Sequence, residues 1–187
     1  MEKTFEVLAQ STHHAILLLS DTEVGKVRIS KWVWTDTKGN VVNAPFGDLP
    51  SVDEQIRLMS FANSINGLVV KFVRKDDYNG KEMLVMERLY PISAESLTQD
   101  ENEKFMSDFE TKLLNLHESL FIHGDIRRPR WQAPECFDNI ILTATGFRLI
   151  DLDFSIILNK DNIREFVQKK LDELRELKSF RNYFLKL

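Results

Sequence analysis

The chain has 187 residues, of which 43% are hydrophobic and 29% are charged, and its formal net charge is −4. This length and composition fit a globular protein of one domain or two small lobes with a substantial core. The excess of acidic residues argues against a general nucleic-acid-binding protein. A single cysteine, Cys136, excludes an internal disulfide framework and a multi-cysteine zinc site.

Two further exclusions concern membranes and export. No apolar run reaches the roughly 18 residues that a membrane span requires. The N-terminal sequence MEKTFEVLAQ lacks the basic-then-apolar layout of a secretory signal. We therefore expect a cytoplasmic protein that does not associate with membranes. Delivery into a host cell without a visible signal is the alternative.

The first part of the chain has the pattern of strands interrupted by one helix. Three strands are predicted from their apolar residues, in TFEVLA, AILLLS and KVRISKWVW. A helix is predicted at about 52–64, where Ile56 and Met59 lie on successive turns. LVVKFVRK and EMLVMERL predict two more strands, joined by a hairpin turn at Asn79-Gly80.

After a polar linker at 91–100, the second part predicts two long helices and a hairpin. Thr98 and Glu101 have the spacing of a capping box, and the apolar residues that follow recur at helical spacing. NIIL and FRLID predict a hairpin that turns at Thr145-Gly146. A last helix is predicted from about 161 to 180. Its apolar stripe comprises Ile163, Val167, Leu171 and Leu174.

Three oxygen-bearing side chains within residues 121–154 carry the strongest chemical signal. Asp125 follows His-Gly, Asn139 precedes an apolar run, and Asp151 ends another apolar run. Such groups at strand ends and in loops suit phosphoryl transfer, in which one group orients the attacking hydroxyl and two hold Mg²⁺.

The stretch FIHGDIRRPRWQAPECFDNIILTATGFRLIDLDF resembles the catalytic core of the protein-kinase-like phosphotransferases. The element order also resembles a kinase amino lobe, a hinge and a reduced carboxyl lobe. The resemblance implies an α+β, bilobal protein-kinase-like fold. Residues 1–88 would form an N-lobe with a five-stranded antiparallel sheet and one helix, and residues 89–187 a strongly reduced, mainly helical C-lobe. It also implies ATP and Mg²⁺ as cofactors.

The carboxyl lobe implied by this resemblance is short. Only 36 residues follow Asp151, and they contain no Ala-Pro-Glu motif. In this respect the chain is more similar to the RIO kinases and to the small kinase of the KEOPS complex than to a signalling kinase.

Within the resemblance, Asp125 in HGD matches the catalytic aspartate, whose carboxylate orients the nucleophilic hydroxyl. Arg127 lies where Ser/Thr kinases usually place a lysine that contacts the γ-phosphate, and a guanidinium suits that contact. The alternative is that Arg127, Arg128 and Arg130 form a solvated basic loop. The glycine in HGD also resembles small-molecule kinases.

The expected metal ligands are displaced along the chain. The family normally places a metal-binding asparagine five residues after the catalytic aspartate, where this chain has Arg130. Asn139 comes nine residues later but keeps the family's twelve-residue separation from Asp151. We interpret RPRWQAPEC as an insertion in the catalytic loop and assign Asn139, Asp151 and Asp153 as metal ligands. The alternative is a degenerate loop in an inactive enzyme.

The resemblance places an ATP-anchoring lysine on the third strand and a glutamate partner in the following helix. Lys31 in VRISKW is the favoured lysine, and Lys26 and Lys71 are alternatives. Glu54 is the favoured partner, although Ser51 and Glu54 also have the spacing of a plain capping box.

The expected hinge is LVMERL, with Met86 as gatekeeper and the backbone of Glu87 and Leu89 bonding the adenine edge. The turn AQSTHHA, which would cover the phosphates, contains no glycine.

The expected function is an Mg-ATP-dependent phosphotransferase of atypical protein-kinase type, acting on a Ser/Thr hydroxyl of a protein partner or on itself. The missing glycines and Arg130 favour an alternative, a pseudokinase that binds nucleotide and docks a partner. HGD and the Asp151-x-Asp153 pattern permit a small-molecule kinase, with a sugar, aminoglycoside or choline as acceptor. A nucleic-acid-facing role for Arg127–Trp131 is the least favoured.

Overall fold

The computed structural model forms two compact units. Unit 1 comprises Met1–Ile56 and Phe72–Arg88, and unit 2 comprises Arg57–Lys71 and Leu89–Leu187. The structure describes residues 5–10, 14–29, 34–35, 41–42, 49–127 and 136–186. No helix within these ranges is long and apolar enough to cross a membrane.

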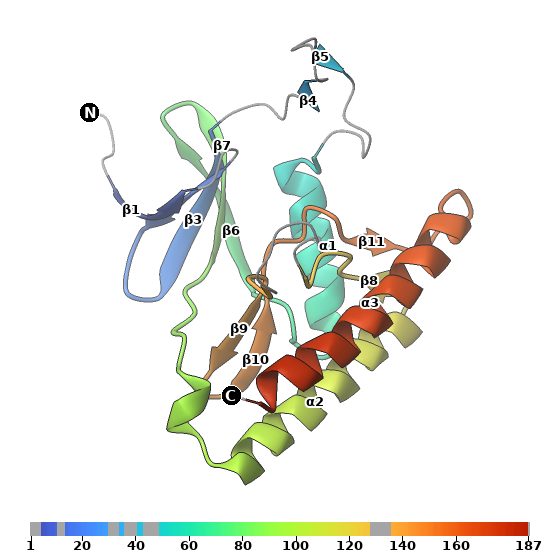
Figure 1. The fold of residues 1–187 in the computed structure, drawn as a ribbon. Helices are drawn as coiled ribbons and strands as arrows, with labels where there is room; N and C mark the ends of the chain where they lie inside the picture. The colour runs from blue at the N-terminus through green and yellow to red at the C-terminus, as the bar shows by residue number, and fades with distance from the viewer. Residues whose placement is uncertain are drawn as a thin grey trace. The chain divides into compact units, whose positions relative to one another are not determined.

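Unit 1 is built on a five-stranded antiparallel sheet, which confirms the sheet predicted from the sequence (Figure 1). Its strands in spatial order are β1 (Glu6–Gln10), β2 (His14–Leu18), β3 (Glu23–Arg28), β7 (Lys81–Glu87) and β6 (Phe72–Tyr78). Asn79 and Gly80 join β6 to β7 at positive φ, 52° and 78°, as an Asn-Gly hairpin turn requires.

The two faces of this sheet differ in chemistry. One face carries an apolar cluster of Ala15, Leu17, Val27, Met83 and Val85. Because successive side chains of a strand point to opposite faces, the residues that precede Val27 and Val85, Lys26 and Leu84, lie on the other face, where they are register partners. The alternation in β3 therefore places a lysine opposite the apolar cluster.

The predicted third strand, KVRISKWVW, is shorter in the structure. Strand β3 ends at Arg28. Lys31 lies outside the described residues. Beyond it, β4 (Trp34–Thr35) and β5 (Val41–Val42) form a separate two-stranded pair.

The predicted strand LVVKFVRK is divided between the two units. Within unit 2, Leu149 N donates to Leu68 O (2.9 Å) and Val70 N donates to Leu149 O (2.8 Å), whereas β6 begins only at Phe72. Residues 68–70 are all buried. Three consecutive buried residues are covered on both faces of the strand, and pairing with Leu149 satisfies their backbone groups within unit 2. The prediction of one continuous strand was therefore wrong.

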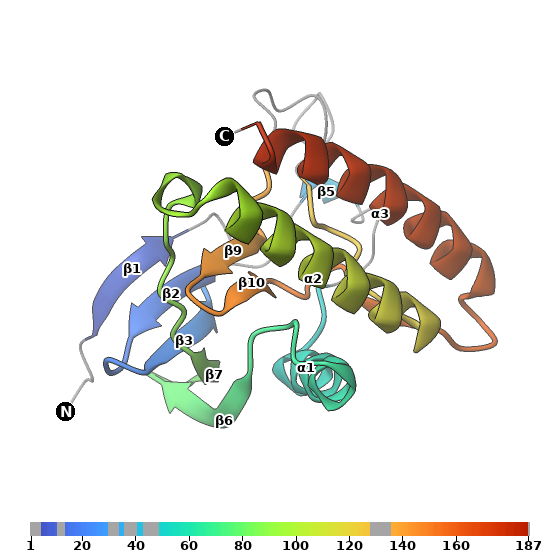
Figure 2. The same cartoon turned by 90° about the horizontal axis from the view of Figure 1, so that it is seen from below.

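Unit 2 contains two long helices that lie side by side in both views, together with a hairpin (Figures 1 and 2). Helix α1 (Val52–Ile65) begins in unit 1 and ends in unit 2, at the predicted position. The remaining elements are η1 (Ala94–Ser96), α2 (Gln99–Glu118), β8 (Phe121–Ile122), β9 (Ile140–Thr143), β10 (Gly146–Leu149), β11 (Ile156–Ile157) and α3 (Ile163–Phe184). The β9–β10 hairpin and both long helices confirm the predicted elements.

The buried face of α3 is not the stripe that the sequence predicted. Ile163, Val167 and Leu171 are 56%, 51% and 47% exposed. The helix instead buries aromatic residues: Phe180 meets Phe109 and Phe147 edge-on, with ring centroids 5.4 and 5.3 Å apart. Aromatic side chains bury more apolar area than aliphatic ones and gain from such edge contacts. The helix has two apolar faces, and the aromatic one packs.

The N-terminus of α2 provides a test of the fold. Thr98 and Glu101 form the predicted capping box, in which Thr98 Oγ1 accepts from Glu101 N (3.3 Å) and Glu101 Oε2 accepts from Thr98 N (2.8 Å). These bonds to Thr98 lower the pKa of Glu101. We expect Thr98→Ala to lower the free energy of unfolding by about 1 kcal/mol, because it removes an N-cap acceptor.

Urea unfolding measures this change. Thr111→Ala is the matched control, since its hydroxyl only donates to Ser107 O within the same helix (2.9 Å). It should alter stability by less than about 0.5 kcal/mol. Equal effects of the two substitutions would contradict a specific capping contribution.

Candidate functional site

The structure brings Asp125, Asn139 and Asp151 together in unit 2. Asn139 Nδ2 donates to the backbone oxygen of Asp125 (2.6 Å) and to its Oδ2 (3.0 Å). Asp151 lies close enough for its charge to raise the pKa of Asp125. The sequence analysis predicted that these residues share one site, although fourteen positions separate Asp125 from Asn139. In the structure the side chains of Asp125 and Asn139 are in contact, and Asp151 lies near them.

The β9–β10 hairpin is the reason that Asn139 and Asp151 adjoin. Asn139 immediately precedes β9, Asp151 follows β10 after one residue, and Ile150 N donates to Asn139 O (3.0 Å) across the hairpin end. Asp151 has a φ of 60°, a conformation that few residues other than glycine adopt. A left-handed residue retained in a packed structure marks a position fixed by its surroundings.

A buried carboxylate on α3 accepts hydrogen bonds from the backbone of the His-Gly-Asp segment. Glu173 is 1% exposed, and its oxygens accept from the backbone amides of His123 (3.2 Å) and Gly124 (3.4 Å). His117 Nε2 lies 3.0 Å from the same carboxylate. His117 and His123 are buried with Glu173 and Gly124 is half-buried, so these bonds are shielded from water and Glu173 fixes the backbone directly before Asp125.

Gly124 is required by this backbone conformation. Its φ is 80°, and an added Cβ would lie 2.6 Å from the carbonyl oxygen of Phe154. That oxygen already accepts from Lys169 Nζ of α3 (2.6 Å). His123 Nε2 donates to Ile150 O (2.8 Å), which ties the segment to the residue before Asp151.

Burial raises the pKa of Asp125, and the charge of Asp151 raises it further. The charges of His123 and Lys169 and the hydrogen bond from Asn139 oppose this rise without cancelling it. A carboxylate of raised pKa accepts a proton more readily than an ordinary aspartate, which suits a group that orients or deprotonates a hydroxyl.

Arg127 and Glu176 lie next to this cluster. The Arg127 guanidinium carbon lies 6.0 Å from the centre of the Phe137 ring, a cation–π contact. Burial, followed by the charges of Glu173, Asp125 and Asp172, raises the pKa of Glu176 to about 7, against an opposing effect of Arg127. Arg128 and Arg130, with the rest of the predicted insertion up to residue 135, lie outside the described residues.

Sequence reasoning missed Glu173 and Glu176. The sequence offered one signal for a buried glutamate. Glu173 lies between Leu171 and Leu174, on a helix whose apolar residues do not all fall on one face. Because the predicted stripe was the wrong face of α3, it gave no reason to single out either glutamate.

The donor set of the cluster suits a hard cation. Carboxylate and amide oxygens are the ligands that Mg²⁺ prefers, and Asn139 and Asp151 supply one of each. Asp153 is half-buried in the turn that follows and stays a predicted ligand. Among the described residues, no three His, Cys, Asp or Glu side chains form a group that could hold a metal ion, so a site here would depend on Asn139.

Unit 1 contains a separate cavity lined by Lys26. Lys26 is the lysine of the third strand in the structure, where the sequence favoured Lys31. The buried residue of α1 that lines the cavity is Gln55, whereas Glu54, the predicted partner, is not in the lining. Glu54 N donates to Ser51 Oγ (3.2 Å), which is half of the capping box considered as its alternative role. Lys71 is exposed.

The predicted hinge lies at the end of β7. Met86 pairs with Val24 of β3, and Arg88 N donates to Thr22 O (2.8 Å). Since successive backbone amides of a strand point to opposite sides, the N–H and C=O of Glu87 point away from β3. Leu89 begins the second segment of unit 2 and is half-buried.

No known family model matches the sequence, and no curated protein is significantly similar to it.

The contacts of Glu173 generate a stability prediction. Glu173→Gln keeps the side-chain shape but replaces one acceptor oxygen with a donor that faces the donors of the loop. We expect it to lower the free energy of unfolding by about 3 kcal/mol, because buried donors lose their acceptor. Glu165→Gln is the control: Glu165 is exposed on the same helix and pairs with Lys169 (3.2 Å). It should cost less than about 0.5 kcal/mol. Similar losses in urea unfolding would contradict the anchoring role.

The raised pKa of Glu176 predicts a pH-dependent stability. Its pKa is about 7 when folded against an ordinary 4.5, so the stability gained from its protonated form is complete below the ordinary value and is lost as the pH rises through 7. Glu176→Gln, which stays neutral, should therefore be more stable than the wild type near pH 8. After allowance for solvent screening, the gain is about 1 kcal/mol, or about 3 °C in Tm. Thermal scans should coincide near pH 4, and a constant offset at both pH values would refute this.

Proposed function

We propose that this protein is an Mg-ATP-dependent phosphotransferase of atypical protein-kinase type that transfers a phosphoryl group to a Ser/Thr hydroxyl. The observation that carries the proposal is the convergence of Asp125, Asn139 and Asp151 beside a backbone fixed by a buried glutamate. Phosphoryl transfer depends mainly on positioning and charge stabilisation, so a rigid constellation of oxygen ligands supports it.

Asp125 is assigned to the nucleophile. Its carboxylate would accept a hydrogen bond from the acceptor hydroxyl and hold that hydroxyl in position. The buried contacts of Glu173 would keep Asp125 from moving during the reaction. Asn139 and Asp151 would hold Mg²⁺, which neutralises charge on the transferring phosphoryl group.

Lys26 is the better-supported cation for the nucleotide phosphates. It lies on the third strand, is buried, and lines a cavity, whereas Lys71 is exposed. Arg127 stays a candidate for the γ-phosphate, but its cation–π contact with Phe137 and its effect on the pKa of Glu176 also give it a structural role. Met86, Glu87 and Leu89 keep their proposed contacts with adenine.

Two observations favour a pseudokinase as the second candidate. The amide nitrogen of Asn139 bonds the carboxylate of Asp125, so the proposed metal ligand is engaged with the proposed catalytic residue. In addition, a neutral Gln55 lines the Lys26 cavity where the kinase resemblance implies a glutamate. Either departure would weaken catalysis while leaving nucleotide binding intact.

Turnover of ATP with Mg²⁺ tests the proposal, measured as phosphate release and as autophosphorylation. Asp125→Asn and Asp151→Asn preserve shape and remove one charge each. Each should reduce turnover at least about a hundredfold, as expected when a positioned acid–base or metal-binding group is lost. Asp161→Asn, at an exposed residue before α3, is the matched control and should leave turnover unchanged.

Equal turnover in the wild type and the three variants would contradict the assignment of Asp125 and Asp151 to catalysis. Binding of ATP without turnover, unaffected by Asp125→Asn, would select the pseudokinase. Transfer to a sugar, aminoglycoside or choline, with none to protein, would select a small-molecule kinase.

A further inference from the structure

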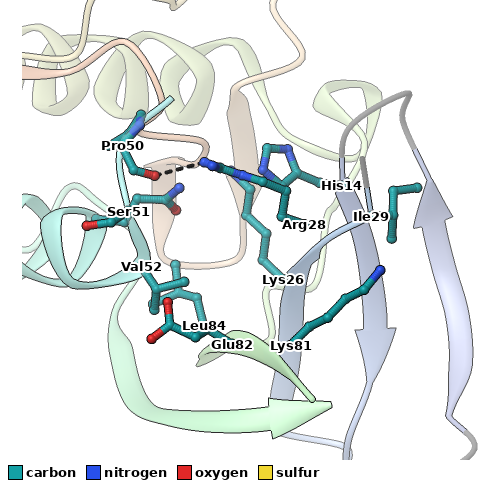
Figure 3. Close-up of a pocket in the computed structure, with 11 residues that line it drawn as sticks. His14, Lys26, Arg28, Ile29, Pro50, Ser51, Val52, Lys81, Glu82 and Leu84 are labelled. Carbon is teal, nitrogen blue, oxygen red and sulfur yellow. Dashed lines mark hydrogen bonds between the residues drawn. The ribbon is translucent and has the colours of Figure 1, made fainter. Parts of the chain in front are cut away.

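Unit 1 contains a cavity of about 440 Å³ whose polar lining is dominated by cations (Figure 3). Lys26 and Arg28 come from β3, Lys81 from the start of β7, and His14 from the start of β2. They line one cavity because β2, β3 and β7 are neighbours in the sheet. Lys81 lies two residues before Met83 and so on the opposite face from Lys26, and in Figure 3 its side chain extends away from Lys26 and Arg28.

The cavity is positive within a chain of net charge −4. Among the described residues, its lining contains three permanent cations and one carboxylate, Glu82. That carboxylate forms an ion pair with Lys75, which is not part of the lining. The cations therefore outnumber the carboxylates inside the cavity, and a concave positive surface concentrates anions from solution.

The cations are held in defined positions. Arg28 Nη2 donates to Pro50 O (2.9 Å), which orients the guanidinium and occupies one of its five N–H donors. Figure 3 shows the Arg28 side chain reaching from β3 to Pro50. Lys26 is only 7% exposed, and the interaction of a charge with an anion strengthens as water is excluded from it.

The apolar part of the lining is contributed by Ile29, Pro50, Val52 and Leu84, and Ser51 and Gln55 add neutral polar groups. The volume lies within the range of pockets that enclose small organic ligands. A ligand that complements both the cationic and the apolar lining has two parts. One is an anionic group that accepts several hydrogen bonds, and the other is an apolar or planar body. A phosphate monoester fits, because its three terminal oxygens accept from guanidinium and ammonium donors together.

We propose that this cavity binds a small phosphate monoester, whose phosphate is held by Lys26 and Arg28 without a metal ion. The inference goes beyond the proposed function, which assigns one lysine to nucleotide phosphates and requires Mg²⁺. Here a second cation, Arg28, replaces the metal as the source of positive charge beside Lys26.

Isothermal titration in EDTA tests the proposal with AMP and ribose 5-phosphate as probes, and with adenosine and inorganic phosphate for comparison. At least one of the two esters should bind in the sub-millimolar range, with adenosine and inorganic phosphate at least about tenfold weaker. Arg28→Gln and Lys26→Met should each weaken ester binding at least about tenfold, the effect of losing one hydrogen bond to a charged group. Lys160→Gln, an exposed lysine in unit 2, is the matched control and should leave it unchanged.

Several outcomes would overturn the proposal. They are absence of binding by both esters, adenosine or inorganic phosphate binding as tightly as the esters, and unaltered affinity in both Arg28→Gln and Lys26→Met. Circular dichroism of each variant establishes that it is folded. Asp151→Asn separates the two hypotheses: ester binding should persist in it whether or not ATP turnover is lost, so failure of the phosphotransferase leaves this test intact.

Discussion

The buried carboxylate of Glu173 is the contact on which the candidate site of unit 2 depends. It accepts from two consecutive backbone amides, those of His123 and Gly124, and therefore fixes the chain direction where Asp125 begins. A buried carboxylate is costly unless its oxygens are satisfied, so the loop and α3 stabilise each other and neither conformation is free to change alone. Only glycine fits at position 124 of this backbone, because the Cβ of any other residue would lie too close to the carbonyl oxygen of Phe154.

The same helix explains why acidic groups crowd around this loop. Glu173 and Glu176 approach it from α3, and Asp151 approaches it from the hairpin. Their mutual repulsion and their burial raise the pKa of Asp125 and of Glu176, so part of the fold's stability is given up at the site. Unit 1 has the opposite character, with cations lining a cavity.

Several elements could be predicted because their signals are local. The capping box at Thr98, the Asn79-Gly80 turn and the β9–β10 hairpin each depend on residues a few positions apart, and all three are present. The convergence of Asn139 with Asp125 was also predicted, from the spacing to Asp151 in a family resemblance. The assignment of Lys31 had no such local support, since a strand's end cannot be read from an uninterrupted run of β-forming residues.

The amino-acid sequence by itself determined the order of the elements, their caps and turns, and the oxygen-bearing residues at the ends of the hairpin. Only the tertiary structure decided which face of α3 is buried, because Phe180 and Phe184 compete with the stripe that begins at Ile163, and packing against α2 and β10 resolves the competition. That choice turns Glu173 inward to the backbone of the His-Gly-Asp segment. Long-range packing of this kind leaves no periodic signal in the sequence, since the partners of Glu173 lie about fifty residues away.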